Sequence, residues 1–450
     1  MMKLKLSCFF ISVFLAGNIV SGQQSANNPG REQWFMDMGF GMFIHWSMDS
    51  QVGAVISHSM AGASEDYLEK FENDLPKTFN PKKFDPDEWA VLAKLAGMKY
   101  VVFTSKHHSG FCMWDTKTTT FNVMNTPFGK DILKEVLDAF RKQGIATGIY
   151  FSPEDFYYFH RNKIPVGRLQ DPKHYPVNNP GLMAYDKAQL KELLTNYGKI
   201  DIFFFDGPEE GLKQYAWELQ PDLVVTRGQM QTPEQTLPDK PVPGPWEACF
   251  TMGTDWQYKP TNDPHKSGTQ IINMLIETRA KGGNLLLNIG PKPDGQIQIE
   301  QEALLREIAL WNLVNQEGIH NIRPWEIIRE RDIWFTKSKN GNAVYAFVPS
   351  GDEWKYAERK EFVFTTLSGT EKTKISILGY SSELVEYRPG YDAKIYFSST
   401  PVGLVISAVN GHRLYTNNKW PNPVVLKIEN VKYKEISNSE LKKSGIDGAL

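Results

Sequence analysis

The chain alternates short apolar runs with amphipathic stretches from about residue 33 to about residue 330. Apolar, β-branched and aromatic residues dominate the short runs, a composition typical of strands buried on both faces. The predicted strands are Gly39–Trp46, Tyr100–Ser105, Ala146–Ser152, Ile200–Asp206, Leu223–Thr226, Trp246–Met252 and Asn284–Ile289. The amphipathic stretches predict helices at Asp85–Leu95, Lys130–Lys142, Asp186–Tyr197, Thr269–Ala280 and Gln301–Gln316. Repeated strand–helix units of this kind indicate an α/β fold, either a (β/α)8-like (TIM) barrel or a doubly wound sheet.

The pattern changes after Pro324, where alternating runs replace the strand–helix units. Ile333–Lys337 and Ala343–Val348 flank Asn340-Gly341, and this dipeptide is a strong signal for a hairpin turn. Further strand-like runs follow at Phe362–Thr366, Ile375–Leu378, Ile395–Phe397, Leu404–Ala408 and Val424–Ile428. The sequence therefore predicts a C-terminal β-sandwich over residues 331–450, appended to a barrel domain over residues 23–330.

The first 22 residues have the character of a signal peptide. Met1–Lys5 supplies a short basic region, Cys8–Ala16 an apolar run, and Val20-Ser21-Gly22 small residues suited to cleavage. The apolar run is too short to span a membrane, and no other stretch approaches the roughly 20 apolar residues required. We therefore expect residues 1–22 to be removed and the protein to be exported, either to a periplasm or into the medium. The polar residues 23–32 are expected to be flexible.

Bulk composition narrows the range of partners. The net charge of −2 gives no reason to expect nucleic acid or an acidic membrane surface. The aromatic content of 12% suits a carbohydrate site, although composition alone favours a large aromatic core as its explanation. Once the signal segment is set aside, Cys112 and Cys249 remain, and we expect two buried thiols rather than a disulfide.

Polar side chains stand at the ends of the first five predicted strands, where a barrel places its functional groups. The side chains or pairs are His45-Trp46, Lys106-His107-His108, Tyr150, Asp206 and Arg227. Asp206 stands out because it follows four apolar residues and must be solvated or paired. An aspartate that only caps the next loop is the alternative.

A metal centre is not expected from the adjacent histidines. Neighbouring side chains on a strand point to opposite faces, so one of His107 and His108 should be a binding residue and the other structural. The chain lacks the HxH and HExxH spacings of zinc sites. We therefore predict neither a metal nor a cofactor.

A glycosidase needs a second carboxyl group that acts as an acid. Glu234 lies in the loop after the fifth strand, and Glu247 follows Trp246 on the next strand. Either could face Asp206, whereas Glu209 and Glu210 are expected to lie in a solvated loop.

Together these blocks resemble glycoside hydrolase family 29, the retaining α-L-fucosidases. The resemblance covers most of the barrel in the family's order. It rests on Gly41-Met42-Phe43-Ile44-His45-Trp46, Lys106-His107-His108-Ser109-Gly110-Phe111, Phe205-Asp206-Gly207, Arg227, Thr232-Pro233-Glu234-Gln235, Trp246-Glu247-Ala248-Cys249 and Gly282-Gly283-Asn284-Leu285-Leu286-Leu287-Asn288-Ile289-Gly290-Pro291. Two departures, Ser109 where the family often has Asp and Ser47 where it often has Gly, bear on pocket contacts and not on the nucleophile.

The resemblance implies roles for individual residues. Asp206 falls on the nucleophile of a double displacement, and Glu234 is favoured over Glu247 as the acid/base. The residues implied to hold fucose hydroxyls or position the carboxylates are His45, His107, His108, Tyr150 and Arg227. Trp46 is implied in the pocket wall, and Glu65 resembles a further sugar-binding residue.

The substrates implied are fucosylated oligosaccharides or glycoconjugates. The methyl group of fucose needs an apolar patch, for which Phe203, Phe205 and Trp325 are the candidates. Two other functions stay open from the sequence. One is a neighbouring specificity such as that of an α-L-galactosidase, and the other is a barrel that binds sugar without catalysis.

Overall fold

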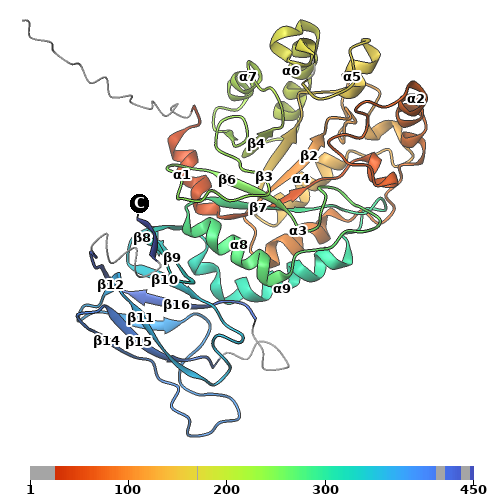
Figure 1. Ribbon diagram of the computed structural model, residues 1–450. Coiled ribbons are helices and arrows are strands. Elements are labelled where there is room, and N and C mark those ends of the chain that lie inside the picture. The colour runs from red at the N-terminus through yellow and green to blue at the C-terminus, as the bar shows by residue number, and fades with distance from the viewer. Residues whose placement is uncertain (1–25, 170, 412–420, 437–445, 450) are drawn as a thin grey trace, which may run out of the picture.

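The computed structural model describes residues 26–169, 171–411, 421–436 and 446–449. The predicted signal peptide, residues 1–22, lies outside this part of the chain. Figure 1 shows a parallel sheet surrounded by helices and, below it, a second layer built of antiparallel strands. Within the described residues, no helix is both long and apolar enough to cross a membrane.

The parallel sheet confirms the predicted barrel-like core. Its strands follow the order β5-β4-β3-β2-β1-β7-β6. They are β1 (Phe40–Ile44), β2 (Tyr100–Lys106), β3 (Ala146–Phe151), β4 (Ile202–Phe205), β5 (Val224–Val225), β6 (Glu247–Thr251) and β7 (Asn284–Ile289). A further segment, residues 231–235, runs parallel to β6 through the bridges Gln231–Trp246 and Glu234–Cys249. The sheet curls as a TIM-like barrel, and this segment extends its wall beyond β6.

The five predicted helices are present among the described helices. These are α1 (Pro29–Met38), α2 (Glu65–Asn73), α3 (Pro86–Leu95), α4 (Ile132–Lys142), α5 (Phe156–Arg161), α6 (Pro180–Thr195), α7 (Leu212–Leu219), α8 (Gly268–Ala280) and α9 (Ile299–Asn315). The expectation that residues 23–32 are flexible is wrong for residues 28–32, because Asn28 caps α1 and Pro29 opens it; residues 23–25 lie outside the described chain. Phe35 of α1 then packs against Tyr100 inside the barrel base.

The C-terminal part confirms the predicted antiparallel sandwich. Its sheets have the orders β13-β16-β10-β9-β8-β18, β11-β15-β14 and β12-β17. The strands are β8 (Ile322–Glu330), β9 (Ile333–Ser338), β10 (Ala343–Val348), β11 (Arg359–Phe364), β12 (Leu367–Ser368), β13 (Lys374–Ile377), β14 (Tyr396–Ser399), β15 (Leu404–Val409), β16 (Val424–Glu429), β17 (Lys432–Tyr433) and β18 (Ile446–Ala449). Since β8 pairs with β9, the antiparallel sheet begins at Ile322, before the boundary placed at residue 330.

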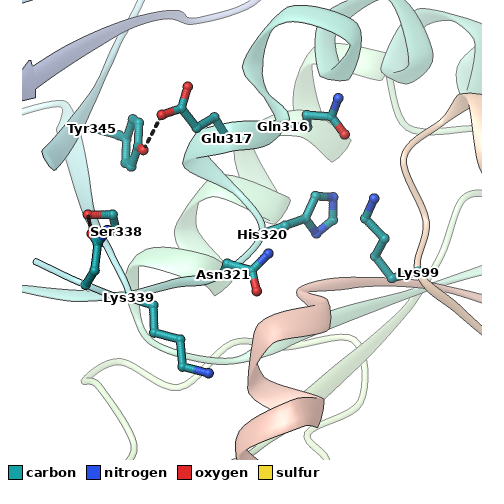
Figure 2. Close-up of a pocket in the computed structure, with 9 residues that line it drawn as sticks. Lys99, Gln316, Glu317, His320, Asn321, Ser338, Lys339 and Tyr345 are labelled. Carbon is teal, nitrogen blue, oxygen red and sulfur yellow. Dashed lines mark hydrogen bonds between the residues drawn. The ribbon is translucent and has the colours of Figure 1, made fainter. Parts of the chain in front are cut away.

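A cavity of about 550 Å³ lies where the two parts meet. Figure 2 shows Lys99, which precedes β2, beside His320, with Tyr345 of β10 hydrogen-bonded to Glu317 on the far side. Lys339 of the C-terminal part also pairs with Asp37 of α1 at 2.6 Å. The sandwich therefore packs on the end of the barrel where the parallel strands begin. The opposite end of the barrel, where the parallel strands finish, is therefore available for a functional site.

The alternation of side chains along each strand divides the barrel's apolar residues into two sets. Phe43, Tyr150 and Phe204 belong to the cluster inside the barrel. Phe203 and Phe205 belong to the larger cluster between the sheet and the helices. Phe203 and Phe205 therefore cannot supply the apolar patch predicted for the sugar, and Phe204 is the inward residue of this strand. Cys112 and Cys249, expected to be buried thiols, are both buried and free.

Candidate active site

Asp206 stands at the point where β4 leaves the sheet. Its backbone N–H still donates to Phe151 of β3 at 3.0 Å, so the strand pairing holds it in place. Gly207 follows with φ 137°, a value that L side chains rarely adopt, and turns the chain away. Because Asp206 lies two residues after Phe204, its side chain points into the barrel mouth, where it is 15% exposed.

Three side chains converge on the Asp206 carboxylate. The Tyr150 hydroxyl donates to Oδ2 at 2.6 Å, and Arg227 Nη1 donates to Oδ1 at 3.0 Å. His108 Nε2 lies 3.5 Å from Oδ2. Burial opposes ionisation of Asp206, but the contact and charge of His108 and the charge of Arg227 outweigh it and hold its pKa well below the usual range. Asp206 is therefore an ionised carboxylate, the state that a nucleophilic role requires.

The loop after β3 orients His108. Ser152 Oγ lies 2.5 Å from His108 Nδ1, which directs Nε2 towards Asp206. Ser152 Oγ also contacts the Glu154 carbonyl at 2.9 Å, which fixes the hydroxyl in turn. The buried Glu154, whose carboxylate lies 3.8 Å from His108 Nδ1, was not found from the sequence. It is not at a strand end, and no residue pattern distinguishes it.

His45 and His107 form a matched donor–acceptor pair in the same mouth. His45 Nδ1 lies 2.6 Å from Asn288 Oδ1, so this nitrogen carries the proton and Nε2 is left as an acceptor. His107 Nδ1 accepts from the His108 backbone N–H at 2.9 Å, which leaves its Nε2 as a donor. Burial lowers the pKa of His45 to about 3 and that of His107 well below its usual value, so both rings are neutral. Such a pair suits sugar hydroxyls, which both donate and accept.

Trp256 belongs to this mouth although the sequence did not single it out. Its ring lies 4.9 Å from that of His45 and 5.9 Å from that of Phe43. Asn288 Nδ2 donates to its backbone carbonyl at 2.5 Å, which ties the loop after β6 to the end of β7. The one available signal was its place in a loop that follows a barrel strand.

Glu234 reaches the nucleophile through a shared arginine. It lies in the 231–235 segment beside β6, and its Oε2 accepts from Arg227 Nη2 at 3.0 Å. The other terminal nitrogen of the same guanidinium, Nη1, donates a hydrogen bond to Asp206 Oδ1. Glu234 is 43% exposed, so it borders solvent at the mouth. The structure thus brings together Asp206 and the favoured acid.

Glu247 lies at the other end of the barrel. It is the first residue of β6 and is fully buried, and the Tyr100 hydroxyl donates to its Oε2 at 2.6 Å. Tyr100 is itself the first residue of β2, which places the pair where the parallel strands start. Burial raises the pKa of Glu247 to about 7. The contacts of Glu247 are those of a core residue.

Two residues implied by the resemblance lie away from Asp206. Trp46 is buried on the helix side of the sheet, with its ring 5.4 Å from that of Trp89. It follows His45 and therefore takes the opposite face of the strand. Glu65 opens α2, is largely exposed, and pairs with His160 at 3.0 Å. Neither side chain contacts the group around Asp206.

Possible ligand atoms of His107, His108 and Asp206 lie within 4.8 Å of one another. A guanidinium 3.0 Å from the same carboxylate opposes a metal cation there, because like charges repel strongly at this range. The cluster fits a carboxylate held by hydrogen-bond donors better than a metal centre.

A curled parallel sheet with an ionised carboxylate, a second carboxyl group and neutral polar rings at its strand ends fits a glycoside hydrolase of the barrel class. The alpha-L-fucosidase family model matches residues 19–317. The chain therefore belongs to the α-L-fucosidase family, glycoside hydrolase family 29. It is a hydrolase of this family, as the resemblance predicted.

Individual proteins agree with this membership. An alpha-L-fucosidase of Dictyostelium discoideum is 27% identical, with 89% of this chain and 94% of that protein aligned. Alpha-L-fucosidase isoenzyme 1 of Paenibacillus thiaminolyticus has the same fold with a TM-score of 0.70 and 27% identity, over 90% of this chain and 99% of that one. A Bacteroides thetaiotaomicron GH29 enzyme, solved as a trapped covalent intermediate with 2-fluoro-fucosyl fluoride, shares the fold with a TM-score of 0.69 at 24% identity, over 91% of this chain and 98% of that one.

Proposed function

We propose that this hydrolase is an exo-acting, retaining α-L-fucosidase that removes terminal fucose with Asp206 as its nucleophile. The observation that carries the proposal is the Asp206 carboxylate at the end of β4, held ionised by Tyr150, His108 and Arg227. A second carboxyl group, that of Glu234, shares Arg227 with it. Glycoside hydrolysis of this kind needs two carboxyl groups, and both lie at the same mouth of the barrel.

The reaction is a double displacement. Asp206 attacks C1 of the fucoside while Glu234 gives a proton to the departing oxygen. Water then attacks the fucosyl–enzyme ester, with Glu234 now acting as base, so fucose leaves with its original configuration. In the reacting complex the two carboxyl groups should lie about 5–5.5 Å apart.

Glu234 is a better acid candidate than Glu247 because of access. The glycosidic oxygen must come within hydrogen-bond reach of the acid, and Glu234 borders solvent at the mouth. Glu247 is enclosed at the strand-start end and already accepts from Tyr100. To serve as the acid, Glu234 has to move off Arg227, since a carboxylate in an ion pair has no proton to give.

The sugar-binding surface combines neutral rings with an apolar wall. His45 and His107 supply an acceptor and a donor for adjacent hydroxyls, and Trp256 supplies an aromatic face beside them. We assign the apolar patch for the fucose methyl group to this Trp256 side. An α-L-galactosidase would need room and a polar partner for a hydroxyl there. A non-catalytic binder would gain nothing from an ionised Asp206.

The natural substrates we propose are fucosylated oligosaccharides or glycoconjugates met outside the cytoplasm. The support for export is the basic, apolar and small-residue pattern of residues 1–22. Cell fractionation with an internal cytoplasmic marker tests this part. A full-length protein retained in the cytoplasm, with Met1 or Met2 still attached, would contradict it.

Product configuration is the direct test of the chemistry. Hydrolysis of an aryl α-L-fucoside, followed by ¹H NMR in its first minutes, should show the α-anomer of fucose before mutarotation. Incubation with 2-fluoro-fucosyl fluoride should add one fluorofucosyl group to the peptide that contains Asp206. The β-anomer as first product would exclude retention, and faster cleavage of the matching α-L-galactoside would favour the alternative specificity.

A further inference from the structure

Glu154 is a fully buried carboxyl group that the proposed double displacement does not use. It lies in the loop after β3, and its Oε2 is 3.8 Å from His108 Nδ1. A Cβ added to Gly207, the residue after Asp206, would lie 3.5 Å from the same oxygen. Glu154 therefore lies behind both the histidine that faces the nucleophile and the turn that follows it.

Two contacts from the loop after α5 hold the Glu154 carboxylate in this place. The Leu169 N–H donates to Oε1 at 3.0 Å, and Arg168 Nε lies 3.5 Å from Oε2. A backbone donor and a guanidinium are the partners that a buried carboxylate needs. Oε2 makes no hydrogen bond of normal geometry with the residues that the structure describes. Glu154 therefore acts on His108 through its charge.

The contacts around His108 fix the protons on its ring. Ser152 has one hydroxyl proton and donates it to the Glu154 carbonyl oxygen at 2.9 Å. Its oxygen can therefore only accept from His108 Nδ1, which lies 2.5 Å away. His108 Nε2 lies 3.5 Å from the ionised Asp206, and only a protonated nitrogen is attracted to a carboxylate. The ring that fits both contacts is an imidazolium, with a proton on each nitrogen.

A buried imidazolium needs negative charge beside it, and His108 has a carboxylate on each side. Asp206 lies 3.5 Å from Nε2, and Glu154 lies 3.8 Å from Nδ1. The two differ during the proposed reaction, because Asp206 becomes a neutral ester and Glu154 keeps its charge. Among the described residues, Glu154 is then the remaining carboxylate within ion-pair distance of His108.

We propose that Glu154 is a positioning residue for the second half of the double displacement, an inference that rests on the proposed retaining mechanism. It keeps His108 protonated while Asp206 is an ester. In the second step water attacks C1 and passes a proton to Glu234, and the bond from C1 to Asp206 breaks with its electron pair left on the carboxylate. The Nε2–H of His108 stabilises this returning charge.

The two steps of the reaction depend differently on this proton. In the first step Asp206 gives up its negative charge, so a donor beside it does not favour the transition state over the free enzyme. In the second step the charge returns, and the same donor stabilises the transition state relative to the ester. Loss of the Glu154 charge should therefore slow hydrolysis of the ester and affect its formation less.

Reactivation of the fluorofucosyl enzyme isolates the second step. The wild type and Glu154→Gln are treated with 2-fluoro-fucosyl fluoride, which transfers its sugar to Asp206 and releases fluoride, and excess reagent is removed. Glutamine keeps the shape and an oxygen for the Leu169 N–H but not the charge. Reactivation should be about tenfold or more slower in Glu154→Gln, whereas inactivation should stay within about threefold of the wild type.

Steady-state kinetics supply a second measurement on the same variant. On an aryl fucoside with a good leaving group, hydrolysis of the ester limits the rate. The kcat and KM of Glu154→Gln should therefore fall together, with kcat/KM nearly unchanged, because the ester accumulates. A residue that only supports the fold would not separate the two steps in this way.

Glu72→Gln is the matched control. The carboxyl group of Glu72 is also fully buried and pairs with a histidine and an arginine, His160 and Arg161, each at 2.6 Å. These partners are on α5 and are not among the groups around Asp206. Glu72→Gln should lower the Tm, because it weakens two buried ion pairs, but it should keep the wild-type reactivation rate.

Glu154→Asp keeps the charge but draws it back from His108. It should slow reactivation about threefold, and it serves as the test if Glu154→Gln does not fold. Wild-type reactivation in the Glu154 variants, with Asp206 labelled, would overturn the role of Glu154 and leave the proposed function intact. Equally slow reactivation in Glu72→Gln would also overturn it. If the wild type takes up no fluorofucosyl group, the retaining mechanism fails and this inference fails with it.

Discussion

Asp206 and Glu247 are both inward-pointing carboxyl groups of the same barrel, yet they have opposite electrostatics. Asp206, at the end of β4, has a tyrosine hydroxyl, an arginine and a histidine around it, and its pKa is held far down. Glu247, at the start of β6, has the hydroxyls of Tyr100 and Thr226 beside it, and burial raises its pKa to about 7. The comparison shows that burial by itself favours the neutral acid, and that the donors and charges at the strand ends keep the Asp206 carboxyl group ionised.

Glu234 differs from both because it is half-exposed and belongs to the 231–235 segment, whose backbone pairs with β6. On the proposed mechanism the nucleophile stays fixed at C1, whereas the acid meets leaving groups of different shapes. The enclosed end of β4 suits the first task, and the position of Glu234 at the solvent border suits the second. Arg227 links the two carboxyl groups.

Removal of Asp206 should have the largest effect. The Asp206→Gly variant should lose roughly 10⁴-fold or more in kcat on an aryl fucoside, because no covalent intermediate can form. Added azide should restore cleavage and give the β-fucosyl azide. Kinetics with and without azide, with the product configuration read by NMR, check this. A variant that keeps full activity without azide would remove Asp206 from the mechanism.

Loss of Glu234 should come next and should depend on the leaving group. Glu234→Ala should lower the cleavage rate of natural fucosides about 10²–10⁴-fold. Formation of the intermediate from an activated aryl fucoside should suffer much less, because a good leaving group needs little protonation. The basic limb of the pH profile for that step should flatten, since no acid remains to lose its proton. Steady-state and single-turnover kinetics on both substrate types measure the difference.

The matched control for Glu234 is Glu247→Ala. It should impair both substrate types together or lower the Tm, because it opens a cavity beside Tyr100. If instead Glu247→Ala shows the leaving-group pattern and Glu234→Ala is close to wild type, the roles of the two glutamates are reversed.

The Glu247→Gln variant should change the pH dependence of stability. The folded pKa of about 7 lies above the unfolded value, so the folded protein binds more protons between the two. The contribution of Glu247 to the free energy of unfolding is therefore greatest below about pH 4.5 and falls as pH rises to about 7. Glutamine cannot ionise, so the variant should gain on the wild type by on the order of 2–3 kcal/mol between pH 5 and 8. Urea unfolding of the wild type and the variant at pH 5 and pH 8 measures this difference. If the free energy of unfolding changes with pH by the same amount in both proteins, Glu247 titrates normally in the folded protein.

Trp256 should give the smallest effect. Trp256→Ala should raise KM for aryl fucosides about tenfold, which corresponds to about 1.4 kcal/mol of lost contact, and change kcat less. Trp256→Phe should recover most of the loss, because it keeps an aromatic face beside His45. Trp46→Phe is the comparison on the other face of β1, and it should lower the Tm without raising KM. Unchanged KM in Trp256→Ala would remove that ring from the sugar site.

Much of the barrel could be predicted because its strands are apolar on both faces and its helices carry clear stripes. The position of Asp206 was also readable, since a carboxylate directly after four buried residues marks a strand end. The face of the sheet on which a side chain lies was harder to predict. The resemblance implies Trp46 in the pocket wall, and Phe203 and Phe205 are candidates for the apolar patch, but the alternation along their strands turns all three towards the helices.

Other features of the site could not be found in this way, because they depend on where loops return. Trp256 lies in a loop without periodicity, and its approach to His45 follows from a hydrogen bond made by Asn288. The choice between Glu234 and Glu247 depends on which end of β6 faces the mouth. The strand register decides this, and the local sequence around either glutamate does not determine that register.

The attachment of residues 231–235 to β6, and not to β3 or β4, has a consequence for how such an enzyme diversifies. Insertions, deletions and substitutions in this segment leave the pairing of β4 with β3 untouched, because the two share no backbone hydrogen bonds. On the proposed mechanism, mutations that spare Glu234 can therefore alter which leaving group is accepted while the residues that bind and attack the sugar are inherited intact. Substitutions that are selected for a new glycan linkage can therefore occur in this segment without disturbing the paired strands that hold Asp206.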